Sequence, residues 1–321
     1  MNFNASRGGS QKAGLAGVIP VMLLPFNEDD SIDEPSLREQ VDFVIARGAN
    51  GVCAPGFATE FYKLTEEERR RVIRIVAEQT GGRVPMFAST GCGSVYATVE
   101  LSRYAAAVGA QALMVTTPKW VTLSSRELAL FFEGVCHNVE LPVMVQDADF
   151  SGAGLPAALI VELAARCPNL KFAKLENTLA GGKCLDIVRG SSGKVQVLYG
   201  MGGIGLLDGL SHGASGVMPG SSFVEIYVRI LELYGRGLLS DAKNLFYRLQ
   251  PYLTFALQHL ELVIQMDKQA LVERGVFSSG RMRQPTLCLD EPYQTEINAL
   301  IADMIRLCAE IKSGTTRRPD H

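Results

Sequence analysis

Residues 170–177 read LKFAKLEN, a mostly apolar stretch that has the character of a buried strand but carries a lysine near its middle. Side chains alternate between the two faces of a strand, so Phe172, Lys174 and Glu176 share one face. An amine and a carboxylate then project side by side near the carboxyl end of the strand. If that face lines a protein interior, desolvation disfavours the ammonium form and makes a nucleophilic amine available at neutral pH. The alternative is a solvated ion pair at a strand end, and the surrounding sequence has to decide between the two.

Similar apolar stretches recur along the chain with helical patterns between them. Strands are expected at residues 18–24, 51–54, 84–88, 112–116, 142–146, 171–176, 195–199 and 216–219. Runs this apolar, joined by crossover helices, are typical of a parallel sheet buried on both faces. Eight strand–helix units in about 220 residues predict a closed (β/α)8 barrel, the TIM barrel, rather than an open doubly wound sheet. By this count Lys174 and Glu176 end the sixth strand, at the rim where such barrels carry their active sites.

Helix start signals follow these strands. Thr65-Glu66-Glu67-Glu68 has the form of a capping box, in which Thr65 caps the helix and Glu68 reaches back to it. Helices are expected to begin near Asp33, Thr65, Ser94, Ser125, Pro156, Leu179, Gly203 and Ser221.

Beyond residue 236 the strand pattern stops, and the sequence becomes helical throughout. A three-helix C-terminal extension is expected at residues 239–260, 261–274 and 291–312. The predicted domain organisation is a flexible tail at residues 1–13, a catalytic barrel at 14–235, a helical domain at 236–312 and a disordered tail at 313–321.

Composition narrows the function classes. The chain has 321 residues, of which 47% are hydrophobic and 20% charged, with a formal net charge of −3 at pH 7, typical of a soluble globular protein. No basic stripe is present, so nucleic acid is not an expected partner, and no run reaches the roughly 18 apolar residues of a membrane span. The seven cysteines are scattered, odd in number and without C-x-x-C spacing, which indicates reduced thiols and a cytoplasmic location. Residues 14–26 resemble a short signal peptide, but two prolines and the acidic turn that follows favour a first strand.

Two other patterns bear on cofactors and metals. Residues 200–205 satisfy the dinucleotide-binding pattern G-x-G-x-x-G. They fall in the seventh unit of a barrel rather than the first unit of an open sheet, which favours a glycine-rich rim loop that lets backbone approach the substrate. The four histidines are far apart and form no H-x-H or H-E-x-x-H arrangement, so no catalytic metal is expected. Trp120, the only tryptophan, could line a pocket mouth or pack in the core.

Several motifs, taken in order, resemble the dihydrodipicolinate synthase / N-acetylneuraminate lyase family of class I Schiff-base lyases over nearly the whole chain. Residues 56–60 (GFATE) and 64–68 (LTEEE) are similar to the family's G-x-x-G-E and L-T-x-E-E after the second strand. Lys174 with Glu176 is similar to its Schiff-base K-x-E, and residues 213–217 (GASGV) match the turn into its eighth strand. Lys268 and residues 281–285 are similar to the family's C-terminal region. The resemblance implies an imine between Lys174 and a small 2-oxo acid such as pyruvate, no further cofactor, and a homotetramer.

Three departures from the family pattern concern the expected site. Gln146 ends the fifth strand, where the synthase and the lyase carry a tyrosine that relays protons, and a glutamine cannot act as a general acid or base. Phe57 and Ala58 replace the paired threonines that hold the pyruvate carboxylate. No arginine or lysine occurs at residues 146–160, where the synthase has an arginine for its second substrate, and Ser151 falls near that position.

The segments Val145-Gln146-Asp147-Ala148 and Thr59-Glu60-Phe61 are similar to the branch that includes L-2-keto-3-deoxyarabonate dehydratase, whose members eliminate water from a 2-keto-3-deoxy sugar acid. This chemistry needs no aldol proton relay. The resemblance implies that Lys174 condenses with the C2 ketone and that Gln146 and Thr59 orient the substrate. Glu176 is the expected proton-transfer group for C3, because it lies on the same face as the lysine two residues along. An ionised Glu176 would favour a charged lysine, so either the carboxyl is protonated or the pair titrates as a unit. Catalytic residues are thus expected at Lys174, Glu176 and Gln146, and substrate contacts at Ala58, Thr59, Glu60, Trp120, Gly200, Gly202 and Met218.

Two other functions stay open at this level. One is a pyruvate-dependent aldolase or synthase, against which the missing tyrosine and arginine count. The other is a non-catalytic homologue that binds a 2-oxo acid, against which the retained imine-forming Lys174 counts.

Overall fold

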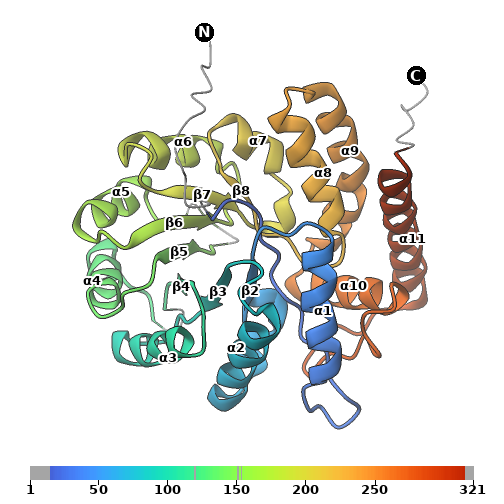
Figure 1. The fold of residues 1–321 in the computed structure, drawn as a ribbon, viewed down its shortest axis with the longest axis horizontal. Helices are drawn as coiled ribbons and strands as arrows, with labels where there is room; N and C mark the ends of the chain where they lie inside the picture. Colours follow the sequence, from blue (N-terminus) through green and yellow to red (C-terminus); the bar gives the residue numbers. More distant parts are fainter. Residues whose placement is uncertain (1–14, 119–120, 150–151, 153, 315–321) are drawn as a thin grey trace.

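The computed structural model describes residues 15–118, 121–149, 152 and 154–314. Eight parallel strands form one sheet in the order β1-β8-β7-β6-β5-β4-β3-β2 (Figure 1). Their bounds are β1 (Gly17–Val18), β2 (Val52–Ala54), β3 (Met86–Ser89), β4 (Ala112–Thr116), β5 (Val143–Asp147), β6 (Leu170–Leu175), β7 (Gln196–Tyr199) and β8 (Gly216–Val217). The chain beyond β1 closes the ring, because Val21 bridges both Cys53 and Gly220. The predicted (β/α)8 barrel is confirmed.

A helix follows each strand on the outside of the barrel. Their bounds are α1 (Glu34–Ala46), α2 (Glu66–Thr80), α3 (Val95–Ala107), α4 (Ser125–Cys136), α5 (Ala157–Arg166), α6 (Gly181–Gly190), α7 (Leu206–Ser211) and α8 (Val224–Gly235). The capping box of α2 is confirmed: Thr65 Oγ1 accepts a hydrogen bond from Glu68 N at 3.2 Å, and Glu68 Oε2 accepts one from Thr65 N at 3.0 Å.

Several expected boundaries differ from the observed ones by two or more residues, among them the helix expected from Ser221, which begins at Val224. The first strand was expected over residues 18–24, but Pro20 and Pro25 lack the N–H that a ladder needs, and only Gly17–Val18 is regular strand. The helix expected from Leu179 begins at Gly181 instead, since Leu179 has a φ of 51°. The helix expected from Gly203 begins at Leu206, because a 3-10 turn, η3 (Met201–Gly203), precedes it.

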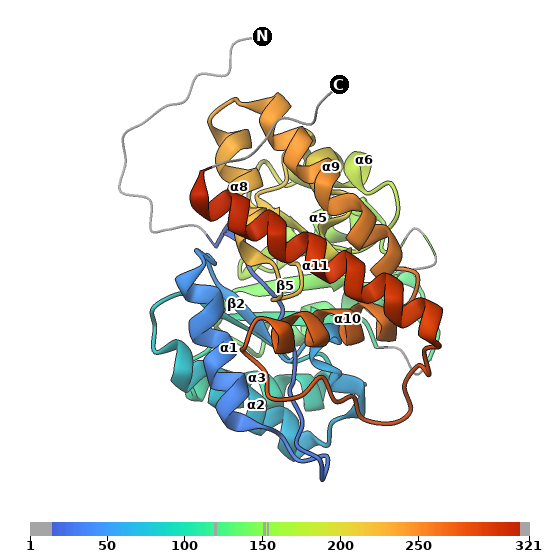
Figure 2. The same ribbon diagram turned by 90° about the vertical axis from the view of Figure 1, so that its right-hand side faces the viewer.

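Three more helices follow the barrel, α9 (Leu239–Ala256), α10 (Leu260–Glu273) and α11 (Glu291–Ser313). Figure 2 shows α11 crossing the outer side of α9 and α10. The expected first helix ended at residue 260, whereas α9 ends at Ala256 and the His259 side chain caps α10 by accepting a hydrogen bond from Glu261 N at 3.1 Å. The division into a barrel domain and a helical domain stays a prediction. The tail expected at residues 1–13 and most of that at 313–321 lie outside the described residues, and Ser313 ends α11.

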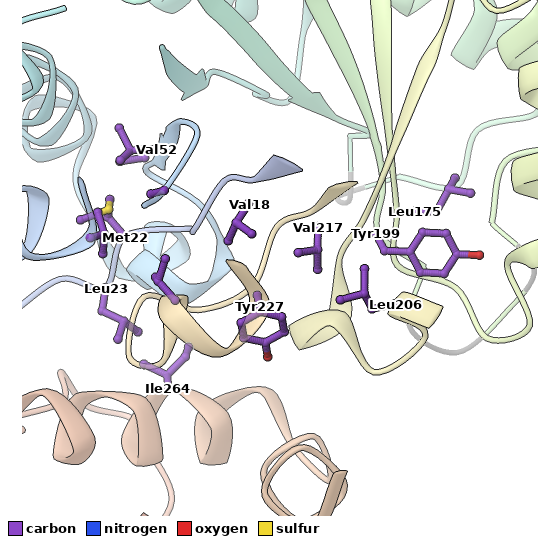
Figure 3. Close-up of a cluster of buried hydrophobic side chains, with 14 of the residues drawn as sticks. Val18, Met22, Leu23, Val52, Leu175, Tyr199, Leu206, Val217, Tyr227 and Ile264 are labelled. Atoms are coloured by element: carbon purple, nitrogen blue, oxygen red, sulfur yellow. The ribbon is translucent and has the colours of Figure 1, made fainter. Parts of the chain in front are cut away.

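The buried side chains form two clusters separated by the sheet. The smaller one fills the barrel and includes Phe87 and Phe172, whose rings pack edge to face at 5.5 Å. The larger one lies between the sheet and the helices and contains Leu175. Figure 3 shows that α10 also joins it, through Ile264 close to barrel residues such as Leu23. The sides of β6 are therefore as the strand alternation predicts: Phe172 points into the barrel and Leu175 away from it.

Candidate active site

Lys174 and Glu176 form a buried ion pair at the carboxyl end of β6. Lys174 Nζ lies 3.0 Å from Glu176 Oε1, and the two residues are only 3% and 6% exposed. β6 ends at Leu175, and Glu176 N then donates a hydrogen bond to Asp147 O at 3.1 Å, which fixes the backbone on which the carboxylate stands. The pair is thus not the solvated strand-end pair that the sequence left open.

Gln146 belongs to the same cluster. It lies opposite Lys174 in the register of β5 and β6, and its Nε2 donates a hydrogen bond to Glu176 Oε2 at 2.6 Å. Met201 N approaches the other oxygen, Oε1, at 3.4 Å. The Glu176 carboxylate is therefore held by three donors: Lys174 of β6, Gln146 of β5 and the backbone N–H of Met201. The Gln146 amide orients Glu176 and cannot itself act as an acid or a base.

Because Gly200 has no side chain, the Glu176 carboxylate has room beside it. A Cβ at this position would lie 2.6 Å from Glu176 Oε1 and closer still to Cγ, a distance that no real side chain tolerates. Gly200 N donates to Leu175 O at 2.8 Å, so the backbone cannot easily withdraw. Gly202, two residues on, has a φ of 60° within η3, a conformation that glycine adopts at little cost. The glycines of the G-x-G-x-x-G pattern thus shape the rim beside the ion pair.

A cavity of about 360 Å³ opens above this pair, between the carboxyl ends of the strands and α10. Its size lies within the range of small-molecule sites. Of the expected site residues it is lined by Lys174, Glu176, Ala58, Gly202 and Met218. Gln146 and Gly200 do not line it and act behind Glu176.

Thr59 and Glu60 lie beside the cavity but not in its lining. The Thr59 hydroxyl donates to Met22 O at 2.6 Å and accepts from Gly56 N at 2.8 Å, so both of its roles are taken by backbone. Glu60 is fully buried with a φ of 56°, and its carboxylate turns toward α10. These orientations could not be predicted, because the sequence of the loop after β2 does not reveal which of its side chains face the cavity.

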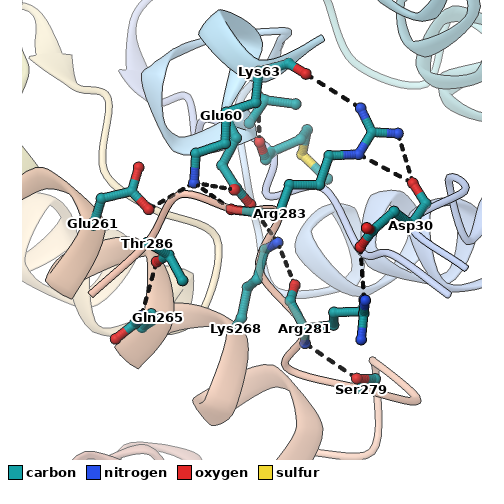
Figure 4. Close-up of polar contacts among 12 residues, drawn as sticks. Asp30, Glu60, Lys63, Glu261, Gln265, Lys268, Ser279, Arg281, Arg283 and Thr286 are labelled. Carbon is teal, nitrogen blue, oxygen red and sulfur yellow. Dashed lines mark hydrogen bonds and ion pairs between the residues drawn. The ribbon is translucent and has the colours of Figure 1, made fainter. Parts of the chain in front are cut away.

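Figure 4 shows what Glu60 does instead. Its carboxylate pairs with Lys268 of α10 and, at 2.9 Å, with Lys63, which also reaches Glu261 at 2.7 Å. Lys268 Nζ donates in addition to Arg281 O at 2.8 Å. Burial lowers the pKa of Lys268 to about 8. The network, called the rim clamp below (Glu60, Lys63, Glu261, Lys268), ties the β2 loop to α10.

Asp267 is a cavity residue that the sequence analysis missed. It lies on α10, is 5% exposed and lines the cavity that Lys174 also lines. Its Oδ1 accepts hydrogen bonds from the hydroxyls of Ser222 and, at 2.8 Å, Tyr252. Burial raises the pKa of Asp267 to about 6. The available signal was an aspartate three residues after Ile264 on the apolar face of a helix, where a carboxylate needs a special reason.

Two residues that the sequence analysis singled out cannot be located in the structure. Trp120 and Ser151 lie outside the described residues. Within the described ranges, His, Cys, Asp and Glu side chains nowhere gather in a group of three that could hold a metal ion. No helix of that part of the chain is long and apolar enough to cross a membrane.

Comparisons with known proteins agree with this geometry. The profile of the Dihydrodipicolinate synthetase family matches residues 14–304. L-2-keto-3-deoxyarabonate dehydratase of Azospirillum brasilense is 27% identical over 288 residues, which cover 88% of this chain and 93% of that protein. YagE of Escherichia coli K12, provisionally named a 2-dehydro-3-deoxy-D-gluconate aldolase, is 27% identical over 303 residues, or 93% of this chain and 99% of YagE.

Solved structures share the fold. A crystal structure of YagE in complex with pyruvate matches with a TM-score of 0.84 at 26% identity, over 91% of this chain and 99% of that one. The resemblance inferred from the sequence motifs is thereby confirmed. Since the family profile spans nearly the whole sequence and the barrel matches a member of the same family, the chain belongs to the Dihydrodipicolinate synthetase family and is a lyase of the class I aldolase type.

Proposed function

We propose that this protein dehydrates a 2-keto-3-deoxy sugar acid through an imine on Lys174. The observation that carries the proposal is the hydrogen bond from Gln146 to Glu176 at 2.6 Å. A glutamine stands at the end of the fifth strand and is spent on orienting a carboxylate, so this position supplies no general acid for an aldol reaction. The similarity to an L-2-keto-3-deoxyarabonate dehydratase over 88% of the chain supports the same reaction class.

The chemistry follows from the buried pair. The Lys174 ammonium first passes a proton to Glu176, and the resulting amine adds to the C2 ketone. Glu176 returns that proton to the departing oxygen, so that loss of water gives an iminium that makes the C3 protons acidic and leaves Glu176 ionised. Glu176, whose Oε1 lies 3.0 Å from the lysine nitrogen, is placed to take one of them. The resulting enamine expels the C4 hydroxyl, which needs a proton to leave as water. Hydrolysis of the unsaturated imine then frees the product and restores Lys174.

Borohydride trapping with intact-mass measurement tests this function. The wild type and Lys174→Ala are incubated with pyruvate and with a panel of 2-keto-3-deoxy pentonates and hexonates. We expect a reduced adduct on the wild type only, and consumption of one sugar acid without added aldehyde. Lys171→Ala is the matched control, because Lys171 lies on the same strand but is exposed, and it should trap substrate like the wild type. An adduct that persists in Lys174→Ala would refute the assigned lysine.

A second candidate is a pyruvate-dependent aldolase or synthase. The specific observation in its favour is the match to YagE, whose crystal structure is in complex with pyruvate. The same experiment separates the two functions. A pyruvate adduct with no sugar acid dehydrated, and with carbon–carbon bond formation when aldehydes are added, would support the aldolase. No adduct from any of these compounds would refute both and favour a protein that binds a 2-oxo acid without reacting with it.

A further inference from the structure

The cavity contains a second carboxyl group, which belongs to α10 rather than to the barrel. Both hydrogen bonds that the described residues give to Asp267 end on Oδ1, from Ser222 and Tyr252. Oδ2 lies over Gly220 at the end of β8, where any Cβ would overlap it. Gly220 and Asp267 both line the cavity. One oxygen of Asp267 is thus anchored, while the other is left for whatever occupies the cavity.

The two carboxyls of the cavity have different surroundings. Among the described residues, Glu176 is reached by an ammonium and two N–H groups, whereas Asp267 is reached only by two hydroxyls and is otherwise desolvated. Burial raises the pKa of Asp267 to about 6, so roughly a tenth of it is protonated at pH 7, far more than for an ordinary aspartate. Unequal environments of this kind assign acid and base roles to paired carboxyls.

The other titratable groups near Asp267 come from three helices and a strand. Tyr252 of α9 donates to it, and burial raises the pKa of that phenol well above its usual value. Tyr227 of α8 also feels the Asp267 charge, and its hydroxyl is bound to Gly202 O at 2.6 Å. His259, before α10, lines the same cavity, as do Lys174 and Glu176 of the β6 end. The neighbouring Lys268 turns its ammonium to Glu60 instead.

We propose that Asp267 is a catalytic acid that protonates the departing hydroxyl of the substrate held on Lys174. The inference rests on the dehydration proposed above. Glu176 takes the C3 proton, the enamine electrons form the C3–C4 double bond as the C4–O bond breaks, and Asp267 gives its proton to the leaving oxygen, so that water departs. Glu176 ends protonated and Asp267 ionised; when the cavity empties, Glu176 gives its proton to solvent and Asp267 takes one from solvent. No oxidant, metal or second substrate enters the step.

Asp267 meets a need that the rest of the site leaves open. Gln146 cannot donate a proton as an acid, and the Thr59 hydroxyl is engaged by backbone. Glu176 cannot both take the proton from C3 and give a proton to the departing C4 hydroxyl unless it moves between the two positions. A carboxyl on the helix that covers the cavity, with Oδ2 left unbonded by its neighbours, completes an acid–base pair.

Asp267→Asn is the test, because asparagine keeps the shape and an oxygen for Ser222 and Tyr252. We expect borohydride trapping of pyruvate on Lys174 to remain within twofold of wild type. Turnover of the sugar acid should fall roughly 100- to 10,000-fold in kcat with little change in KM, the usual contribution of a positioned acid. The wild-type kcat should decline as pH rises through the pKa of Asp267, and this limb should disappear in Asp267→Asn.

Tyr252→Phe provides a second readout that a purely structural role would not move. The Tyr252 hydroxyl lowers the pKa of Asp267, so its removal should shift the alkaline limb of the kcat profile to higher pH. An Asp267→Asn protein that dehydrates within twofold of wild type, or one that changes only KM, would overturn the inference. So would loss of pyruvate trapping in that variant, since it would mean that Asp267 holds the cavity together. Failure of the proposed function is distinct, because the wild type itself would then dehydrate no sugar acid.

Discussion

The buried carboxylate of Asp267 should lower the free energy of unfolding at pH values above about 6, where it is ionised. Its folded-state pKa of about 6 lies above the usual value of 3.8, so the folded protein holds this proton more tightly than the unfolded chain does. The stabilising effect of the protonated form is fully present below about pH 4 and is lost as pH rises through 6.

Asp267→Asn should therefore raise the free energy of unfolding at pH 8, by on the order of 1–3 kcal/mol, because it removes a buried charge. The gain should shrink toward zero at pH 4. Urea unfolding followed by circular dichroism at both values measures it. A gain of equal size at both pH values would contradict the assigned titration.

Gly200 is the position where the smallest change should cost most activity. In Gly200→Ala the methyl group would collide with Glu176, and the carboxylate would have to leave Lys174 and Gln146. A displacement of about 1 Å at a reacting group costs roughly 100-fold in rate, so we expect at least that loss in kcat.

Gly182→Ala is the matched control for this steric effect. Gly182 lies in α6 with nothing within 4 Å of its hypothetical Cβ, and alanine there should leave turnover unchanged. Comparable kinetics for Gly200→Ala and Gly182→Ala would show that Glu176 needs no fixed position.

Whether a residue's place at the cavity could be predicted depended on the kind of structure that positions it. Lys174 and Glu176 were predictable because strand alternation puts them on one face and the barrel count puts that face at the rim. Asp267 was not, since it reaches the cavity only through the packing of α10 across the barrel mouth. Thr59 was expected to touch substrate, yet its hydroxyl bonds to Met22 O, a contact between distant segments that local sequence does not encode.

At the scale of elements, local chemistry decided which boundaries could be predicted. The start of α2 followed from the reciprocal bonds of Thr65 and Glu68, and that of α1 from Asp33, which accepts from Ser36 N at 3.1 Å. The first strand was overextended because its apolar pattern continues through Pro20, where ladder pairing is interrupted. The break between α9 and α10 was missed by a few residues because the turn at residues 257–259 contains no glycine or proline to mark it.

The turn between α9 and α10 also shows how element packing makes a site. Leu257, His259 and Leu260 line the cavity together with Lys174 at the strand ends. A barrel alone would leave its rim open to water. The helical extension covers it, so that the imine chemistry proposed for Lys174 takes place in a water-poor space where electrostatic interactions are strong.

At the scale of the whole molecule, the rim clamp couples the barrel to its helical extension. Glu60 of the barrel and Lys268 of α10 are both fully buried and form an ion pair across 208 positions of sequence. Removing Glu60 leaves the buried Lys268 ammonium without the carboxylate that binds it, which costs about 3–5 kcal/mol, whereas removing Lys268 leaves Glu60 paired with Lys63. The location in the cytoplasm and the homotetramer implied by the family resemblance stay predictions at this scale.

A double-mutant cycle on the rim clamp tests this coupling. We expect Glu60→Gln to lower the free energy of unfolding by about 3–5 kcal/mol and Lys268→Met to lower it by less, because Lys63 still pairs with Glu60. The double variant should lose less than the sum, because the unpaired Lys268 charge is gone. Urea unfolding gives the four stabilities. The exposed pair Glu66–Arg70 on α2, 2.9 Å apart, is the control, and its cycle should give a coupling below about 1 kcal/mol. Additive losses at Glu60 and Lys268 would mean that each is held by its other contacts, and that α10 is fixed over the cavity by apolar packing alone.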